Sequence, residues 1–350
     1  MRANSFSAEQ GLKALFLFVT LVFVAACSQP PMANHKLTGP TMGTVWTVQL
    51  ANVPEGMTAE EVKEGVEERL ALVNAQMSTY DPKSSISLYN TAAKGTWHEI
   101  PKEFAYVLDA ALELAEISQG AFDPTIGPLV NLWGFGPTAR GEEIPSEDTI
   151  AQVQKRIGWQ RVERRAKGNE IYQPGGVYLD LSAIAKGYAV DLVGEYLTEI
   201  GVQGWLVDIG GDLRTYGRKA NGELWHIAVE RPQPGQREAT SVLALGDKAV
   251  ATSGDYRNFY ATEEGQFSHT VDPRTGKPVA HGLASVTVLH ESCMIADGLA
   301  TLLTVLGPEE GLRFAEQEGL EVLLIVRDKT TEAFEQASTP SFEQHLKEEN

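Results

Sequence analysis

Apolar side chains recur every three or four positions over residues 58–77, and this spacing predicts an amphipathic helix. Thr58 stands three residues before Glu61, which is the spacing of a capping box, so we expect the helix to begin beside Thr58. Similar helical patterns cover residues 102–118, 147–157, 182–200 and the stretch that begins at Ser292.

Strand patterns fill most of the remaining chain. Residues 41–50 (TMGTVWTVQL) alternate between apolar and polar side chains and predict a first strand. Many short apolar runs follow one another over residues 160–181 and 204–288. Because strands and helices do not alternate regularly, this order predicts an α+β fold with antiparallel sheets, in place of a doubly wound parallel sheet.

One segment fits neither pattern. Residues 120–137 (GAFDPTIGPLVNLWGFGP) contain four glycines and three prolines, which interrupt regular structure, together with several large apolar side chains. Ordinary loops carry few such side chains, so we expect this segment either to fill a core or to form a rigid apolar wall.

The N-terminus has the pattern of an export signal. Residues 1–26 combine early basic residues with a short apolar run, and LVFVAAC resembles a lipobox that ends at Cys27. We therefore expect a signal peptide over residues 1–26, lipidation of Cys27 and a flexible tether over residues 27–39. An ordinary cleaved leader with a free cysteine is the alternative. The second cysteine, Cys293, lies in an apolar helical pattern and is expected to be a buried, inert thiol.

The chain is acidic. Its 350 residues carry a formal net charge of −18, and removal of residues 1–26 takes away Arg2, Lys13 and Glu9, which makes the mature chain −19. An acidic surface repels phosphates, so nucleic acid is not an expected partner. Any phosphate-bearing ligand would need a local cation.

Two helical segments carry side chains that could supply such chemistry. Ser182 is a plausible N-cap for the helix that follows LDLSAIAKG, and Lys186 in its first turn would suit an anion, although a solvated lysine is the simpler interpretation. In SCMIADGLATLLTVLG, Asp297 and Thr301 lie one helical turn apart, so both could ligate a hard cation such as Mg²⁺. A polar pair that only meets a neighbouring loop explains that spacing equally well.

A histidine is the candidate proton acceptor. His269 stands in FSHTVDPRTGKP, between apolar strand residues and a charged turn. The chain contains neither Gly-x-Gly-x-x-Gly nor a Walker-type loop, and a tight turn accounts for the glycine pair of VDIGGD.

These segments, taken together and in order, resemble the ApbE-type FAD:protein FMN transferases, a family of bacterial flavin transferases that are often lipoproteins. The resemblance spans nearly all of residues 40–326. It rests on TMGT, MSTYDPKSSISLYN, GAFDPTIGPLVNLWGFGP, DLSAIAKGYAVD, VDIGGD, ATSGDYRNF, SHTVDPRTGKP and ADGLATLLTVLG. One departure from the family is Gly298, where alanine is common.

The resemblance implies a fold, a reaction and a set of site residues. The fold would be a mixed α+β architecture related to the T-fold, with antiparallel sheets flanked by helices and the FAD site between lobes. The catalytic domain would span residues 40–330, followed by a polar tail over residues 331–350. His269 would be the catalytic histidine, and the carbonyl of Ala183 would hold Mg²⁺ together with Asp297 and Thr301. FAD contacts would fall to Met42, Tyr80, Ala121, Phe122, Asp123, Asp180, Lys186 and Val271.

The implied reaction cleaves FAD, the substrate, with the help of Mg²⁺. FMN would be attached to a threonine or serine hydroxyl of an acceptor flavoprotein, such as a subunit of a membrane redox complex, and AMP would be released. The resemblance places the protein on the periplasmic side of the inner membrane, with outer-membrane anchoring as an alternative. An FAD pyrophosphatase and a flavin-binding lipoprotein without activity are the alternative functions.

Overall fold

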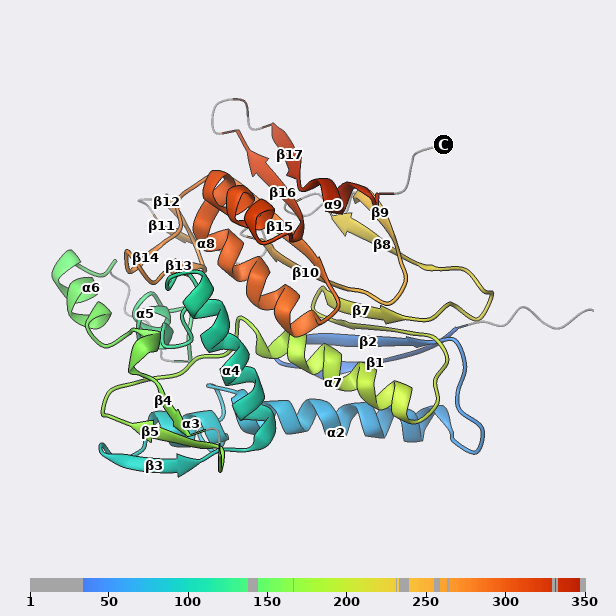
Figure 1. The fold of residues 1–350 in the computed structure, drawn as a ribbon, viewed down its shortest axis with the longest axis horizontal. Coiled ribbons are helices and arrows are strands. Elements are labelled where there is room, and N and C mark those ends of the chain that lie inside the picture. The colour runs from blue at the N-terminus through green and yellow to red at the C-terminus, as the bar shows by residue number, and fades with distance from the viewer. Residues whose placement is uncertain are drawn as a thin grey trace, which may run out of the picture.

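The computed structural model describes residues 34–137, 144–165, 167–230, 232, 239–254, 259–262, 265–328, 331 and 333–346. Its centre is an eight-stranded sheet in which each neighbouring pair is antiparallel (Figure 1). The strands, in spatial order, are β1 (His35–Thr41), β2 (Thr44–Leu50), β6 (Trp205–Ile209), β7 (Asp212–Tyr216), β10 (Ala249–Gly254), β15 (Leu283–His290), β16 (Glu321–Arg327) and β17 (Phe334–Ser338).

The first two strands form a hairpin, which corrects two predictions. Thr41 pairs with Thr44, and Met42 and Gly43 make the turn with φ angles of 47° and 72°. The predicted strand over residues 41–50 therefore begins only at Thr44. The predicted tether over residues 27–39 is too long, because residues 35–39 already pair with β2 at the edge of the sheet.

Helices cover one face of the sheet. The helix α7 (Ala185–Glu199) packs on β6 and β7, and α8 (Cys293–Gln317) packs on β10, β15 and β16, while α2 (Ala59–Met77) lies against α7 and α4 (Lys102–Ile117) against α8 (Figure 1). The capping box of α2 is present: the Thr58 hydroxyl accepts the Glu61 N–H, and the Glu61 carboxylate accepts the Thr58 N–H at 2.7 Å. The helix α8 is broken at Gly307, whose φ is 80°.

The sheet is buried on both faces. In β6, Trp205, Val207 and Ile209 belong to a large core under the helices, and Leu206 belongs to a second core on the opposite face. In β15, Val286 and Val288 belong to the first core and Leu289 to the second. This explains why seven of the eight residues of β15 are buried in a nearly continuous apolar run. The second core is closed by the hairpin of β8 (Trp225–Glu230) and β9 (Ala239–Leu245) and by α9 (Pro340–Glu343).

The C-terminal prediction is also wrong in part. We expected residues 331–350 to be a polar tail, yet β17 pairs with β16 in the main sheet. Phe342 in α9 is fully buried in the second core. The polar composition of this stretch concealed the strand, because an edge strand needs few apolar residues when its backbone supplies the pairing.

A smaller part of the molecule adjoins the helices. It contains a three-stranded sheet of β3 (Thr96–Glu99), β5 (Glu170–Gln173) and β4 (Glu163–Arg165). Its other elements are α3 (Ser85–Asn90), α5 (Gly127–Leu132), α6 (Glu147–Gln154), the 3₁₀ turn η1 (Trp159–Arg161), and the short hairpins of β11 (Phe259–Thr262) with β12 (Gly265–Ser268) and of β13 (Val271–Asp272) with β14 (Lys277–Pro278).

A third, separate cluster of buried residues lies in this smaller part. Leu129 and Trp133 come from the glycine- and proline-rich segment, Ile150 from α6 and Val271 from β13. The Trp133 indole N–H donates to the Gly276 carbonyl at 2.8 Å, across 143 residues of sequence. The segment over residues 120–137 thus contains one short helix, α5, and is fixed to the turn that follows β13.

The predicted α+β fold with antiparallel sheets and flanking helices is confirmed. One helix start is wrong: α7 begins at Ala185, three residues after the expected cap, because the Ser182 N–H and hydroxyl donate to Asp180 instead. Cys293 is fully buried as predicted, and burial raises the pKa of its thiol.

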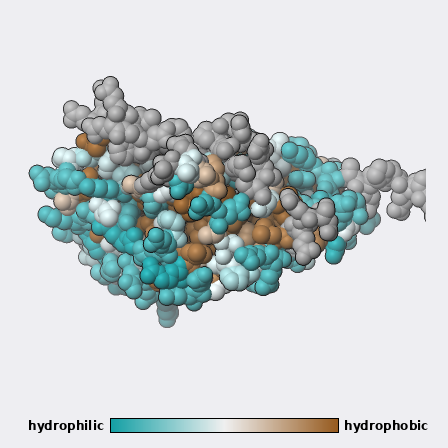
Figure 2. All heavy atoms as spheres, turned by 90° about the horizontal axis from the view of Figure 1, so that it is seen from above, coloured by the Kyte–Doolittle hydropathy of each residue, from teal (hydrophilic) through white to brown (hydrophobic). Residues whose placement is uncertain are grey.

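Apolar side chains gather in the middle of the face drawn in Figure 2, between hydrophilic margins. Across the part of the chain that the structure describes, each helix is too short or too polar to span a bilayer.

Candidate active site

A cavity of about 1120 Å³ lies where the helices, the main sheet and the smaller part of the molecule meet. Its walls come from the turn between β1 and β2, the end of α2, the segment over residues 121–136, the start of α7, the first half of α8, and strands β8, β10 and β13. A cavity of this size can hold a large cofactor.

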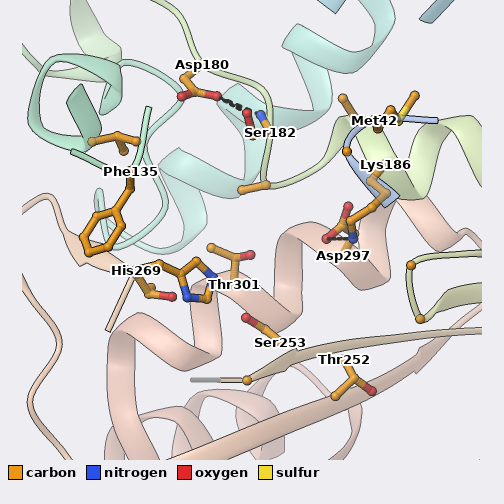
Figure 3. Close-up of a pocket in the computed structure, with 18 of the residues that line it drawn as sticks. Met42, Phe135, Asp180, Ser182, Lys186, Thr252, Ser253, His269, Asp297 and Thr301 are labelled. Carbon is orange, nitrogen blue, oxygen red and sulfur yellow. Dashed lines mark hydrogen bonds and ion pairs between the residues drawn. The ribbon is translucent and has the colours of Figure 1, made fainter. Parts of the chain in front are cut away.

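The structure brings the predicted site residues together. All twelve that lie in the described residues line this one cavity, although they come from six separate stretches of sequence: Met42, Tyr80, Ala121, Phe122, Asp123, Asp180, Ala183, Lys186, His269, Val271, Asp297 and Thr301. Figure 3 labels six of them together with some of their neighbours. The remaining predicted site, the lipidated Cys27, lies outside the described residues.

Asp297 and Lys186 form the polar centre of the cavity (Figure 3). The Asp297 carboxylate accepts the Gly187 N–H at 2.9 Å through Oδ2, and its Oδ1 lies 3.9 Å from the Lys186 ammonium. Burial raises the pKa of Asp297, while the nearby ammonium and the N–H donor oppose that rise. Thr301 follows one helical turn later on α8 and lines the same cavity.

Gly187 makes this contact between the two helices possible. A Cβ at this position would lie 2.2 Å from the carbonyl oxygen of Cys293 and 2.8 Å from Cβ of Asp297. Without a side chain, α7 approaches α8 closely enough for the hydrogen bond to Asp297. This bond also ties Asp297 to the stretch that contains Ala183, four residues before Gly187, so the expected ligands from two distant parts of the chain meet at one cavity.

The apolar side of the cavity is built by the glycine- and proline-rich segment and by β13. Phe122 and Val271 are each 4% exposed, whereas Tyr80 is 66% exposed at the rim and donates from its hydroxyl to the Phe135 carbonyl. The cavity therefore has rigid backbone with buried apolar side chains on one side and a polar centre on the other. Such a cavity would suit a flat, mostly apolar ring that carries a charged chain.

Two predicted binding carboxylates already have partners within the protein. Asp123 accepts the N–H and the hydroxyl of Thr125 and the N–H of Trp159, at 2.7 to 3.1 Å. Burial raises the pKa of Asp123, and these donors oppose the rise. Asp180 accepts the N–H and the hydroxyl of Ser182, as Figure 3 shows. Both carboxylates therefore also fix the loops that form the cavity wall.

His269 lies between β12 and β13, two residues before Val271, and lines the cavity as expected. Its ring is half-buried, and Figure 3 draws it among the residues of the cavity wall. The side chain comes from the smaller part of the molecule, while Asp297 and Lys186 come from the helices on the main sheet.

Sequence reasoning missed a buried carboxylate beside Lys186. Asp212, the first residue of β7, is 2% exposed and forms an ion pair with Lys186. It belongs to VDIGGD, and the predicted tight turn is present, since Gly210 and Gly211 have φ angles of 64° and 104°. The available signal was an acidic residue at the very start of a predicted strand, because a carboxylate that becomes buried there needs a partner.

The cavity, with its apolar wall, its lysine and its buried carboxylate, defines the class of site: a pocket for a bulky organic anion, with hard oxygen atoms placed where a metal ion could bind. A model of the ApbE family matches residues 42–324. The chain belongs to the ApbE family.

Relatives of known name agree over nearly their full length. A Vibrio cholerae protein named FAD:protein FMN transferase is 38% identical over 334 residues, which cover 95% of this chain and 98% of the relative. A Haemophilus influenzae protein of the same name is 40% identical over 328 residues, with 91% and 93% covered. The solved structure of the flavin transferase ApbE from Vibrio cholerae matches with a TM-score of 0.82 at 38% identity, covering 90% of this chain and 100% of that one.

Proposed function

We propose that the protein is an FAD:protein FMN transferase that uses Mg²⁺. The reaction cleaves the pyrophosphate of FAD, joins FMN through a phosphoester bond to a threonine or serine hydroxyl of an acceptor flavoprotein, and releases AMP. The observation that carries the proposal is the meeting of Asp297, Lys186 and Thr301 with an apolar wall in one cavity of a chain from this family.

The donor atoms at the cavity fit Mg²⁺. Asp297, Thr301 and the carbonyl of Ala183 offer only oxygen atoms, which this ion prefers. Within the described ranges, no group of three or more histidine, cysteine, aspartate or glutamate side chains could hold a metal ion by itself. Such a sparse set suits Mg²⁺, which is commonly held by one or two carboxylates together with substrate phosphates and water. When bound there, the ion would neutralise charge on the phosphates.

The chain also fits FAD. Phe122, Val271 and the exposed Tyr80 would contact the flavin ring, and Lys186 would bind the diphosphate with its ammonium. A chain of net charge −19 after export can bind an anionic dinucleotide only if cations reverse the potential locally, and Lys186 lies where that is needed.

His269 would act as the general base. Its ring nitrogen takes the proton of the acceptor hydroxyl, the hydroxyl oxygen forms a bond to the phosphorus on the FMN side, and the bond from that phosphorus to the AMP oxygen breaks. The chain supplies the rest of the reaction by orienting the two substrates in the cavity.

The test is His269→Ala with an acceptor flavoprotein domain, FAD and Mg²⁺, followed by mass spectrometry for an FMN adduct. We expect transfer to fall about 100- to 10,000-fold, while FAD binding measured by flavin fluorescence stays within about threefold. His226→Ala is the matched control, because His226 is exposed on β8 and does not line the cavity. Unchanged transfer by the His269 variant would remove this residue from the mechanism.

The same assay separates the alternative functions. Release of AMP with free FMN and without an adduct would identify a pyrophosphatase. Intact FAD in the presence of Mg²⁺ would identify a flavin-binding protein without activity. Both outcomes would contradict the proposed transfer.

We also propose that the protein is an exported lipoprotein that acts on the periplasmic side of the membrane, where a redox complex subunit would be its acceptor. The N-terminal pattern that ends at Cys27 supports this location. Cys27→Ser should move the protein from the membrane fraction to the soluble fraction, and retention in the membrane would contradict lipid anchoring at this residue.

A further inference from the structure

Two ion pairs of opposite polarity join β7 to α7. Lys186 of the helix pairs with Asp212 of the strand, and Asp191 of the helix pairs with Arg214 of the strand at 2.7 Å. Asp212 and Arg214 are two residues apart on β7, so their side chains point to the same face of the sheet. Lys186 lines the cavity, whereas Asp212, Asp191 and Arg214 lie behind the wall.

Asp212 depends on Lys186. Its side chain is 3% exposed, and its Oδ1 accepts the Thr252 N–H at 3.3 Å. Its Oδ2 has no hydrogen-bond partner among the described residues apart from its ion-pair contact with the Lys186 ammonium. An ionised carboxylate that is this deeply buried is costly without a cation, so the ammonium is held on β7.

Asp297 has a different principal partner. Its Oδ2 accepts the Gly187 N–H at 2.9 Å, and the ammonium stays 3.9 Å from Oδ1, beyond hydrogen-bond range. One ammonium therefore lies between two buried carboxylates, in direct contact with Asp212 and in a longer ion pair with Asp297. The flexible four-carbon stem of Lys186 would allow it to move onto Asp297 if Asp212 lost its charge.

We propose that Asp212 is a positioning residue that tunes the affinity of the site for its divalent cation. By holding the Lys186 ammonium on β7, Asp212 prevents it from closing onto Asp297, whose carboxylate then stays available to the metal ion. This inference rests on the proposed function and adds to it the side chain that controls competition between the lysine and the metal.

The test measures metal binding without turnover. Flavin-free protein is titrated with Mn²⁺, and the free ion is followed by its electron paramagnetic resonance signal. The four proteins are the natural chain, Asp212→Asn, Lys186→Met and the double variant. We expect Asp212→Asn to weaken Mn²⁺ binding about tenfold or more, because unit charges about 4 Å apart interact strongly in a partly buried site. In the Lys186→Met background the same change should cost less than about threefold, since the competitor is gone.

The double-variant comparison excludes a simpler explanation. Removal of any negative charge near the site could weaken cation binding, and that effect would be equal with and without Lys186. Equal losses in both backgrounds, or no loss in either, would overturn the proposal. If Asp212→Asn does not fold, Asp212→Ser takes its place alone and in the Lys186→Met background, and the same two comparisons support or overturn the proposal.

Arg214→Gln is the matched control, because it removes the other ion pair between β7 and α7 but does not touch Lys186. The Arg214→Gln variant should have a lower melting temperature, and its Mn²⁺ affinity should stay within about twofold of that of the natural chain. A larger loss of affinity would mean that general loosening of α7 sets metal binding, and not the position of Lys186. Failure of the natural chain to bind Mn²⁺ would contradict the proposed function itself, whereas binding that is indifferent to Asp212 would contradict only this inference.

Discussion

Asp191 should be among the most costly side chains to remove, although it lies outside the cavity. Its carboxylate accepts four hydrogen bonds: from Arg214 Nη1 at 2.7 Å, from the Ser292 hydroxyl at 2.7 Å, and from the Cys293 and Met294 N–H groups at 3.0 Å each. The residue is 6% exposed. It thus caps the N-terminus of α8 from α7 and pairs with β7 at the same time.

The magnitude follows from what its loss leaves behind. Asp191→Ala would leave the Arg214 guanidinium without its carboxylate and two N–H groups of α8 without an acceptor. Removal of one partner from a buried ion pair costs about 3–5 kcal/mol, so we expect the free energy of unfolding to fall by about 4 kcal/mol. Asp191→Asn keeps one accepting oxygen and the shape of the side chain, and should cost about 2 kcal/mol.

Urea unfolding followed by tryptophan fluorescence measures both losses. Glu195→Gln is the control, since it removes an exposed carboxylate one turn later on α7 and should change stability by less than about 0.5 kcal/mol. A loss below about 1 kcal/mol for Asp191→Ala would refute the reasoning, because it would show that the buried donors find other partners at little cost.

Two further predictions concern the helices. Gly187→Ala places a Cβ 2.2 Å from a backbone carbonyl, so it should force α7 away from α8 and weaken Mn²⁺ binding at Asp297 more than about tenfold. In Gly298→Ala the one close contact of the new Cβ is with the movable end of the Leu114 side chain, so Mn²⁺ binding should change less than about twofold. Similar Mn²⁺ titrations for both variants would contradict this prediction. The Thr58 N–H and hydroxyl hold the pKa of Glu61 below its ordinary value. Because the folded-state pKa is the lower one, this stabilisation is present above the unfolded-state pKa and lost as the pH falls through the folded-state pKa. Urea unfolding over a pH series should therefore show a stability gap between the natural chain and Glu61→Gln that closes on acidification, and a constant gap would disprove the capping role.

Local features were predictable from sequence because their causes are local. The capping box at Thr58 and the turn at Gly210 and Gly211 depend on residues a few positions apart, and both are present. The placement of Asp297 and Thr301 one turn apart on the same helix needed only helical spacing. Misplacement of the α7 start at Ser182 has a local cause as well, since Asp180 competes for the same donors.

Long-range partners could not be predicted in this way. The partners of Asp191 include residues more than 100 positions away, and the acceptor for the Trp133 indole lies 143 positions away. Asp212 and Lys186 meet only because β7 and α7 are neighbours in the folded chain. The family resemblance supplied the predicted site residues of the cavity. Its motifs also contain Asp191 and Asp212, but it gave these two residues no role, because their partners are visible only in the folded chain.

The two sides of the cavity belong to different cores. Val271, two residues from His269, packs with Trp133 in the small third cluster, while the stretch around Asp297 packs in the large core under the helices. A cluster of four buried residues opens more easily than one that contains most of the molecule's interior. On warming, the histidine side of the cavity should therefore lose its fixed position while the sheet is still intact, so that the temperature at which the enzyme stops working lies below the temperature at which it melts.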